Sequence, residues 1–291
     1  MKVGFIGLGI MGFNMAKNMV KGGFDVLGLD VFEEVKQKFV GVGGKAAKNV
    51  EQVYNECDVV FFSLPTNKIV IENLEIAEKL AKPGTIVADM SSSAPSFIKP
   101  AYEKLKAKGV HLLDSPVSGG QSGAEAGTLS IMVGGDKEIF DKVKPILDAA
   151  GRNVRFMGPS GCGDVAKLVN NMIVGINIAA LGESMAFAAK AGIDTEEMYK
   201  VMIGGAATSY VLESKGPMLV ANNYKATGRL ATHIKDLGNA EEVAKDLGVD
   251  IPFSMMTYKI MKDLGEQGHA DEDHCVVAKY FEEKMGTHIY K

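Results

Sequence analysis

Short apolar runs and helix-like stretches alternate along roughly the first 160 residues of this chain. The apolar runs fall at residues 2–6, 24–29, 58–64, 85–90, 111–114, 130–133 and 154–157. Stretches between them, such as 69–81 and 96–108, place apolar residues every three or four positions, which is the period of a surface helix. Strands that alternate with helices are typical of a doubly wound parallel sheet. We therefore predict an α/β domain over residues 1–162.

The pattern changes from residue 163 onward. Residues 165–191 form a long run of Ala, Ile, Leu, Met and Asn without proline, and the run is apolar on more than one side. Because about 27 residues exceeds an average helix, we expect a buried helix that bridges two domains or lies between subunits. Further helical patterns follow at 195–204, 209–222, 233–247, 253–265 and 275–285. The prediction is an all-α second domain, residues 163–291, that begins with a long interdomain helix.

Three glycines lie directly after the first apolar run, in the segment GFIGLGIMG that starts at residue 4. Gly7, Gly9 and Gly12 have the spacing G-x-G-x-x-G. In proteins with this motif, a strand turns sharply into a helix whose free N–H groups and dipole face a pyrophosphate. Gly7 allows the turn, Gly9 lets the ligand approach, and Gly12 lets the helix pack on the strand. We predict a dinucleotide loop that includes Ile10 and Met11; a glycine-rich turn without a ligand is the alternative.

An acid closes the second apolar run at Asp30. A carboxylate at the end of the second strand accepts both ribose hydroxyls of NAD and repels the 2'-phosphate of NADP. We therefore expect a Rossmann-type domain that binds NAD, with NADH preferred over NADPH.

Composition narrows the class of protein. A chain of 291 residues exceeds what one core usually organises, which favours two domains. The net charge of −4 gives no electrostatic reason to expect nucleic acid as a partner. No apolar run reaches about 18 residues and no signal peptide is evident, so we expect no membrane partner and a cytoplasmic location. The three cysteines, which are widely separated, suggest neither disulfides nor a cysteine metal site.

The chemistry requires a group that exchanges a proton while hydride moves to or from a nicotinamide. Lys167 lies in the segment GCGDVAKLVNN at the start of the predicted long helix. A partly desolvated ammonium loses proton affinity and can exchange its proton near neutral pH. Asn171 lies one turn further along, and Asn170 is beside it, so their amides can fix a substrate or orient the lysine. A salt-bridged interface lysine is the alternative.

A second candidate cluster follows the strand at 111–114, in the segment DSPVSGG. Ser118, Gly119 and Gly120 place a hydroxyl and adjacent backbone amides where ligands bind in doubly wound sheets, and such amides can cradle a carboxylate. A glycine-rich loop without a ligand would look the same. The hydroxyls of the segment DMSSSAP, residues 89–95, either reach the nicotinamide or cap the next helix.

Four motifs, GFIGLGIMG, DSPVSGG, GCGDVAKLVNN and HIKDL, together resemble the β-hydroxyacid dehydrogenase family over nearly the whole chain. The resemblance implies that Lys167 is the general acid and base. It also implies a small carboxylate-bearing substrate and a homodimer or homotetramer. The substrate that it favours is tartronate semialdehyde, reduced to glycerate, with 3-hydroxyisobutyrate or another 3- or 4-hydroxyacid as the alternative. The remaining roles that it implies are substrate binding by Ser118, Gly119, Gly120, Asn170 and Asn171, and cofactor binding by Leu64, Pro65, Ser92 and Lys235.

Other interpretations stay open at this point. Arg229, in a segment that departs from the family pattern, is either a second carboxylate ligand or a solvated surface charge. The Y-x-x-x-K spacing at Tyr102 looks accidental, and the acid- and histidine-rich stretch 269–274 suits a solvated loop better than a metal site. A noncatalytic NAD-binding module and an imine reductase are the other function classes; a lysine at position 167 argues against both.

Overall fold

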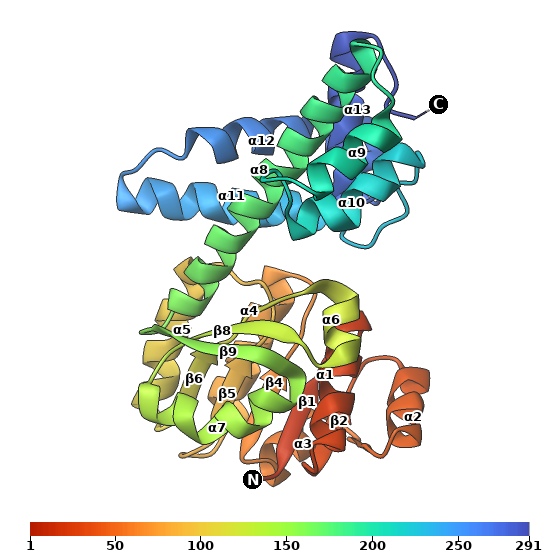
Figure 1. Ribbon diagram of the computed structural model, residues 1–291. Helices are drawn as coiled ribbons and strands as arrows, with labels where there is room; N and C mark the ends of the chain where they lie inside the picture. The colour runs from red at the N-terminus through yellow and green to blue at the C-terminus, as the bar shows by residue number, and fades with distance from the viewer. Residues whose placement is uncertain (291) are drawn as a thin grey trace. The chain divides into compact units, whose positions relative to one another are not determined.

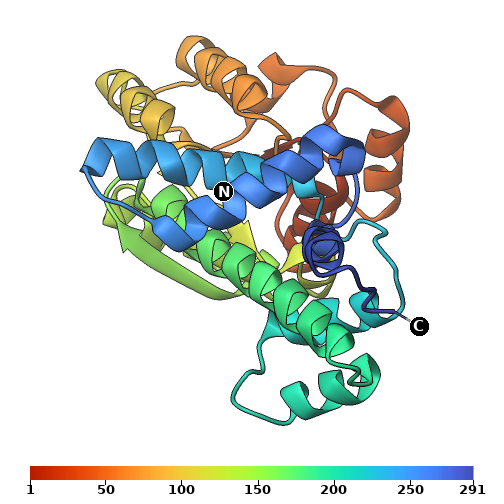
Figure 2. The ribbon, with the colours of Figure 1, turned by 90° about the horizontal axis from the view of Figure 1, so that it is seen from above.

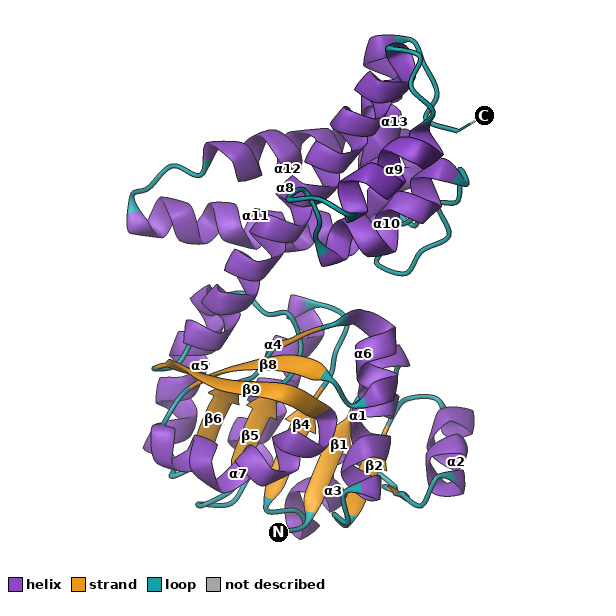
Figure 3. Cartoon of the chain, in the orientation of Figure 1, coloured by secondary structure: helices purple, strands orange, loops and turns teal. Residues whose placement is uncertain are grey.

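The computed structural model describes residues 1–290 and divides into two compact units, Met1–Lys167 and Leu168–Lys291. The first unit is built on a nine-stranded sheet with the order β3-β2-β1-β4-β5-β6-β8-β7, and β9 pairs with β8 (Figures 1 and 3). The strands are β1 (Val3–Ile6), β2 (Val26–Leu29), β3 (Lys45–Ala46), β4 (Val59–Phe62), β5 (Ile86–Asp89), β6 (His111–Asp114), β7 (Val117–Ser118), β8 (Leu129–Gly134) and β9 (Gly151–Gly158).

Helices cover both faces of this sheet. They are α1 (Ile10–Lys21), α2 (Glu33–Gly41), α3 (Val50–Glu56), α4 (Asn67–Leu80), α5 (Pro95–Ala107), α6 (Gly120–Ala126) and α7 (Lys137–Ala150). Alternate residues of a strand point to opposite faces, so Phe61 joins the core beneath α1 and α7, whereas Phe62 joins the core beneath α3, α4 and α5. Because both faces are covered, the central strands read as continuous apolar runs.

The sheet is parallel only as far as β6. β8 runs antiparallel to both β6 and β7, and β9 runs parallel to β8. The prediction of a parallel sheet was therefore wrong at this edge, and it missed the two-residue strands β3 and β7. Apolar runs reveal that a strand exists, but its direction depends on the connections between strands.

Over its described residues, 168–290, the second unit contains helices and no strand, with one isolated bridge between Arg229 and Asp273. Its helices are the greater part of α8 (Cys162–Lys190), α9 (Thr195–Ile203), α10 (Tyr210–Val220), α11 (Leu230–Leu247), α12 (Pro252–Leu264), a π-helical turn η1 (Gly265–His269), a 3-10 turn η2 (His274–Val276) and α13 (Val277–Met285). α11 and α12 lie side by side in both views (Figures 1 and 2). The expected α/β domain followed by an all-α domain is confirmed.

The sequence predicts a buried helix here, but the long helix α8 is not buried on every side. One face packs inside the second unit, where a Cβ on Gly182 would lie 3.0 Å from Ala278 of α13. Val169, Ile173 and Phe187 are 55%, 57% and 67% exposed. Among residues 1–290, α8 alone is long and apolar enough to cross a membrane, a test that core helices also pass. The sequence shows no apolar run of about 18 residues here, because Asn and Gly residues interrupt the apolar residues of α8. The expected homo-oligomer stays a prediction, which these exposed side chains favour.

Candidate active site

The glycine loop joins β1 to α1. Gly7 has φ +92°, and a Cβ on it would lie 2.3 Å from the Ser63 carbonyl oxygen. A Cβ on Gly12 would lie 1.9 Å from the Gly7 carbonyl oxygen, so the helix reaches the turn only without a side chain there. A Cβ on Gly9 would meet nothing within 4 Å. Gly7 and Gly12 are therefore required by the backbone itself, whereas Gly9 keeps a space open.

The start of α1 is suited to an anion. Gly9 is its N-cap and has no side chain to cap the helix, and the first turn contains no acidic residue. Ile10 and Met11, the first residues of α1, thus contribute amides that their own helix does not use. A pyrophosphate fits such a helix terminus, because the free N–H groups and the helix dipole favour negative charge. The residues present fit the dinucleotide that the sequence predicts.

Asp30 is fixed above this loop. One carboxylate oxygen accepts a hydrogen bond from the Leu8 N–H at 2.7 Å and the other accepts one from the Phe32 N–H at 3.0 Å. Each oxygen keeps a further lone pair, which a ribose hydroxyl can use. The first turn of α2 adds Glu33 and Glu34, so negative charge accumulates after β2. This negative charge disfavours the additional 2'-phosphate of NADP.

The ends of β4 and β5 are tied together. The Leu64 N–H donates to the Ser91 hydroxyl at 2.9 Å, which fixes the turn that contains Leu64 and Pro65. Asp89 accepts hydrogen bonds from the Ser91 N–H at 3.0 Å and the Ser93 hydroxyl at 2.5 Å. Ala94 is the N-cap of α5 and makes no side-chain cap, so none of the serines occupies the N-cap position of that helix. Ser92 is half-buried between them.

Ser118 lies in β7, opposite Ser130 of β8, rather than in a loop as expected. Gly119 and Gly120 follow with φ of +132° and +63°. Both φ values lie in the region that favours glycine, so the turn explains these glycines even without a ligand. Their amides and the half-buried Ser118 hydroxyl remain the predicted carboxylate site.

A residue that the sequence reasoning did not select holds the start of α8 on the sheet. Asp114, fully buried at the end of β6, accepts hydrogen bonds from the Gly161 N–H at 2.8 Å and the Asp164 N–H at 3.0 Å. Burial raises its pKa to about 6, although these backbone bonds act in the opposite direction. Lys167, which is half-buried, lies one turn beyond Asp164. Asp114 therefore fixes the segment from which Lys167 projects.

The second unit brings three predicted residues together around another unselected acid, Asp236 of α11. The Asn171 amide donates to Asp236 at 2.5 Å, and the Asn170 amide donates to the Asn171 side-chain oxygen at 2.9 Å. Lys235 lies 3.0 Å from the second oxygen of Asp236. The signal for Asp236 was available, because it is the acid of the HIKDL motif. What the sequence could not show is its contact with a residue 65 positions away.

The alternatives that the sequence left open can now be placed. The Arg229 side chain is 58% exposed and pairs at 3.6 Å with Asp271, which is 90% exposed, so it is a solvated surface charge. Tyr102 donates to Asp136 at 2.6 Å, and burial raises its pKa, which is the wrong direction for a catalytic phenol. In the described part of the chain, no three His, Cys, Asp or Glu side chains converge as a metal site would require.

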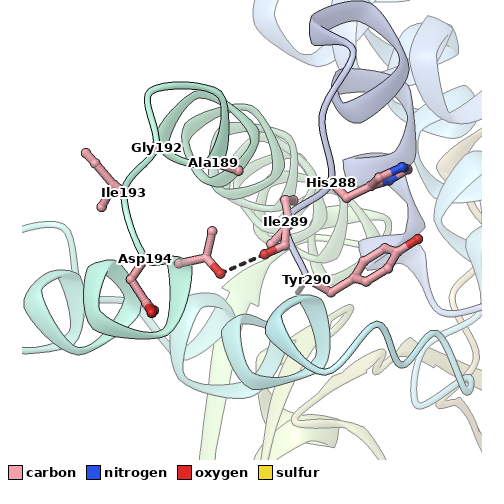
Figure 4. Close-up of a pocket in the computed structure, with 8 residues that line it drawn as sticks. Ala189, Gly192, Ile193, Asp194, His288, Ile289 and Tyr290 are labelled. Carbon is pink, nitrogen blue, oxygen red and sulfur yellow. Dashed lines mark hydrogen bonds between the residues drawn. The ribbon is translucent and has the colours of Figure 1, made fainter.

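The second unit also contains a hollow of about 260 Å³ (Figure 4). It lies where the C-terminal tail meets the turn after α8. The Thr195 hydroxyl donates to the Ile289 carbonyl oxygen at 2.7 Å, and this bond holds the tail (Figure 4). None of the predicted site residues lines this hollow.

Comparisons with known proteins cover both units. A family model described as the NAD binding domain of 6-phosphogluconate dehydrogenase matches residues 2–158. A second, described as NAD-binding of NADP-dependent 3-hydroxyisobutyrate dehydrogenase, matches residues 161–281.

Full-length relatives show the same extent of similarity. 2-(Hydroxymethyl)glutarate dehydrogenase of Eubacterium barkeri is 35% identical, over 99% of this chain and 97% of that protein. 2-Hydroxy-3-oxopropionate reductase of Escherichia coli (strain K12) is 34% identical, over 97% of each chain. The crystal structure of 3-hydroxyisobutyrate dehydrogenase from Salmonella typhimurium has a TM-score of 0.88 at 29% identity, over 96% of this chain and 99% of that one.

Proposed function

Because the chain belongs to the β-hydroxyacid dehydrogenase family, we propose that it reduces a short semialdehyde that carries a carboxylate, with NADH as the hydride donor. The substrate that we propose is tartronate semialdehyde, which gives glycerate, and the reverse oxidation is chemically equivalent. The coarser assignment, an oxidoreductase that uses a nicotinamide cofactor, follows from the family.

The observation that carries this proposal is the amide and carboxylate cluster one helical turn beyond Lys167. Asp236 and Asn170 fix the Asn171 amide, yet one of its N–H groups and one lone pair remain for a substrate. A fixed polar group beside a half-buried lysine is what proton transfer to a bound carbonyl compound requires.

The proposed reaction divides the work among these residues. When bound, the nicotinamide supplies hydride to the carbonyl carbon. Lys167 donates a proton to the carbonyl oxygen, so the aldehyde gains one hydride and one proton and becomes a primary alcohol. The amides of Ser118, Gly119 and Gly120 hold the carboxylate. Asn171 orients the substrate with the part of its amide that remains available.

The proposed substrate is tested against several others, because relatives of nearly equal identity are named for different substrates. NADH consumption should be measured with tartronate semialdehyde, methylmalonate semialdehyde, succinic semialdehyde, 2-formylglutarate and a cyclic imine. We expect the highest kcat/KM with tartronate semialdehyde. A higher value with another semialdehyde would replace the substrate but keep the reaction class. Turnover of the imine alone, or of none while NADH still binds, would contradict the proposed function.

Cofactor preference is predicted to depend on the Asp30 charge. Asp30→Asn keeps one acceptor oxygen for the backbone and removes the charge, so we expect the preference for NADH over NADPH to narrow about tenfold. Asp30→Ala should narrow it further, mainly by weakening NADH. The measurement is kcat/KM with each cofactor, and Glu51→Gln, an exposed acid on α3, is the control. A wild type that prefers NADPH would contradict this prediction.

A further inference from the structure

Two buried histidines of the second unit contact each other directly. His233 lies in α11 and is 5% exposed, and the side chain of His274, in η2, is 13% exposed. Their Nδ1 atoms are 3.2 Å apart, with the rings at 70° to one another. The proposed reaction gives neither residue a role.

The partners of the pair fix where its protons lie. His233 Nε2 is 3.0 Å from the Asn171 carbonyl oxygen, and a carbonyl can only accept, so Nε2 carries a proton. A neutral His233 then has an unprotonated Nδ1, which must accept from His274 Nδ1–H. Burial and the neighbouring His233 and Lys215 lower the pKa of His274 to about 3, which keeps it neutral. When both imidazoles are neutral, the pair therefore has one arrangement, with the His233 proton on Nε2 and the His274 proton on Nδ1.

A missing side chain on α8 makes the bond to Asn171 possible. A Cβ on Gly175 would lie 2.8 Å from His233 Nε2, so glycine leaves the space through which the imidazole reaches the helix backbone. The carbonyl of Asn171 has a second lone pair, so it can accept from His233 in addition to its helical bond. Glycine inside a helix costs stability relative to alanine, and the contact with His233 explains why glycine occupies position 175.

His274 is itself anchored from behind. The backbone N–H of His274 donates to the Gly228 carbonyl oxygen at 2.9 Å. The preceding residue, Asp273, is fully buried. Lys215 donates to both Asp273 oxygens, at 2.9 and 2.8 Å, and the Thr227 and Gly228 N–H groups donate at 2.8 and 3.0 Å. The charged pair is thus satisfied inside the unit and fixes the backbone that carries His274, with Asp273 Oδ1 3.8 Å from His274 Nε2.

We propose that His233 and His274 are positioning residues that hold Asn171 by its backbone, while Asp236 holds the same residue by its side chain. His233 and Asp236 are three residues apart on α11 and therefore share a face of that helix. Asn171 is gripped at two points by one rigid element, which fixes the direction of the amide group left for the substrate. The inference rests on the proposed function for its kinetic consequence, but not for its geometry.

The geometry is tested by ¹⁵N NMR of histidine side chains, with no substrate or cofactor present. We expect His233 as the Nε2–H tautomer and His274 as the less common Nδ1–H tautomer near pH 7.5. His233→Gln and His274→Asn assign the signals and place amide nitrogens near the original donors. A His233 without a proton on Nε2 would overturn the proposal, because it could not donate to the Asn171 carbonyl oxygen.

The consequence is tested by a double-mutant cycle on kcat/KM for the best semialdehyde. His233→Leu should lower kcat/KM roughly 10- to 100-fold, as expected for a small misplacement of a substrate-binding group, with NADH affinity unchanged. His233→Gln should restore most of the loss, and Gly175→Ala should reproduce it by displacing the imidazole. In an Asn171→Ala background, His233→Leu should cost less than about twofold, because its effect passes through Asn171.

An equal loss in both backgrounds would overturn the positioning role, as would full activity of Gly175→Ala. His288→Leu, at an exposed histidine, is the matched control. If the wild type turns over no semialdehyde, the proposed function fails while the NMR result still decides the geometry. The two failures are therefore distinguishable.

Discussion

Replacement of Lys167 by alanine is expected to lower kcat for the semialdehyde at least a hundredfold and to leave the Kd of NADH nearly unchanged. The proton that it supplies neutralises the alkoxide formed as hydride arrives, and general acids typically contribute about 10²- to 10⁴-fold. The glycine loop and Asp30 are intact in the variant, so cofactor binding has no reason to change. Single-turnover rates and NADH titrations measure the two quantities separately.

Lys190→Ala is the matched control, because Lys190 is an exposed lysine in the last turn of the same helix. A small primary amine added to Lys167→Ala should recover part of the rate, since it can occupy the vacated space and carry a proton. Retained turnover in Lys167→Ala would show that another group donates the proton.

The local part of this protein could be predicted from the sequence. Gly7, Gly9 and Gly12 have the conformations or clearances that their spacing suggested, because a strand, a turn and a helix follow one another without a distant partner. Most helices begin within three residues of the expected position. α4 starts earlier than its apolar period because the Thr66 hydroxyl caps it by accepting from the Ile69 N–H.

Contacts across long sequence separations could not be predicted in this way. Asp114 holds the start of α8 across 47 and 50 positions, and Asp236 holds Asn171 across 65. A periodicity shows which face of an element is buried, but not which polar group waits in the facing element. The exposed residues of α8 illustrate the same limit, since a run that is apolar on every side does not state what covers each side.

Burial of neutral His274 is expected to make the second unit sensitive to mild acid. The folded pKa is about 3, below the ordinary 6.5, so the unfolded chain binds a proton that the folded chain excludes. The contribution of neutral His274 to the free energy of unfolding is therefore fully present above about pH 7, and it is lost as the pH drops through 6.5. Between pH 7.5 and pH 5 the loss should reach about 2 kcal/mol.

His274→Asn removes the titrating group and keeps a donor, so its free energy of unfolding should lack this slope. Unfolding by urea at pH 7.5, 6 and 5, for wild type and variant, gives the difference directly. That difference is needed because buried Asp114, whose pKa is raised to about 6, stabilises the first unit as the pH falls, which is the opposite sign. His288→Asn, at an exposed site, should retain the wild-type slope. If the His274→Asn and wild-type curves run parallel, His274 accepts its proton in the folded state, and the buried pair is not held neutral.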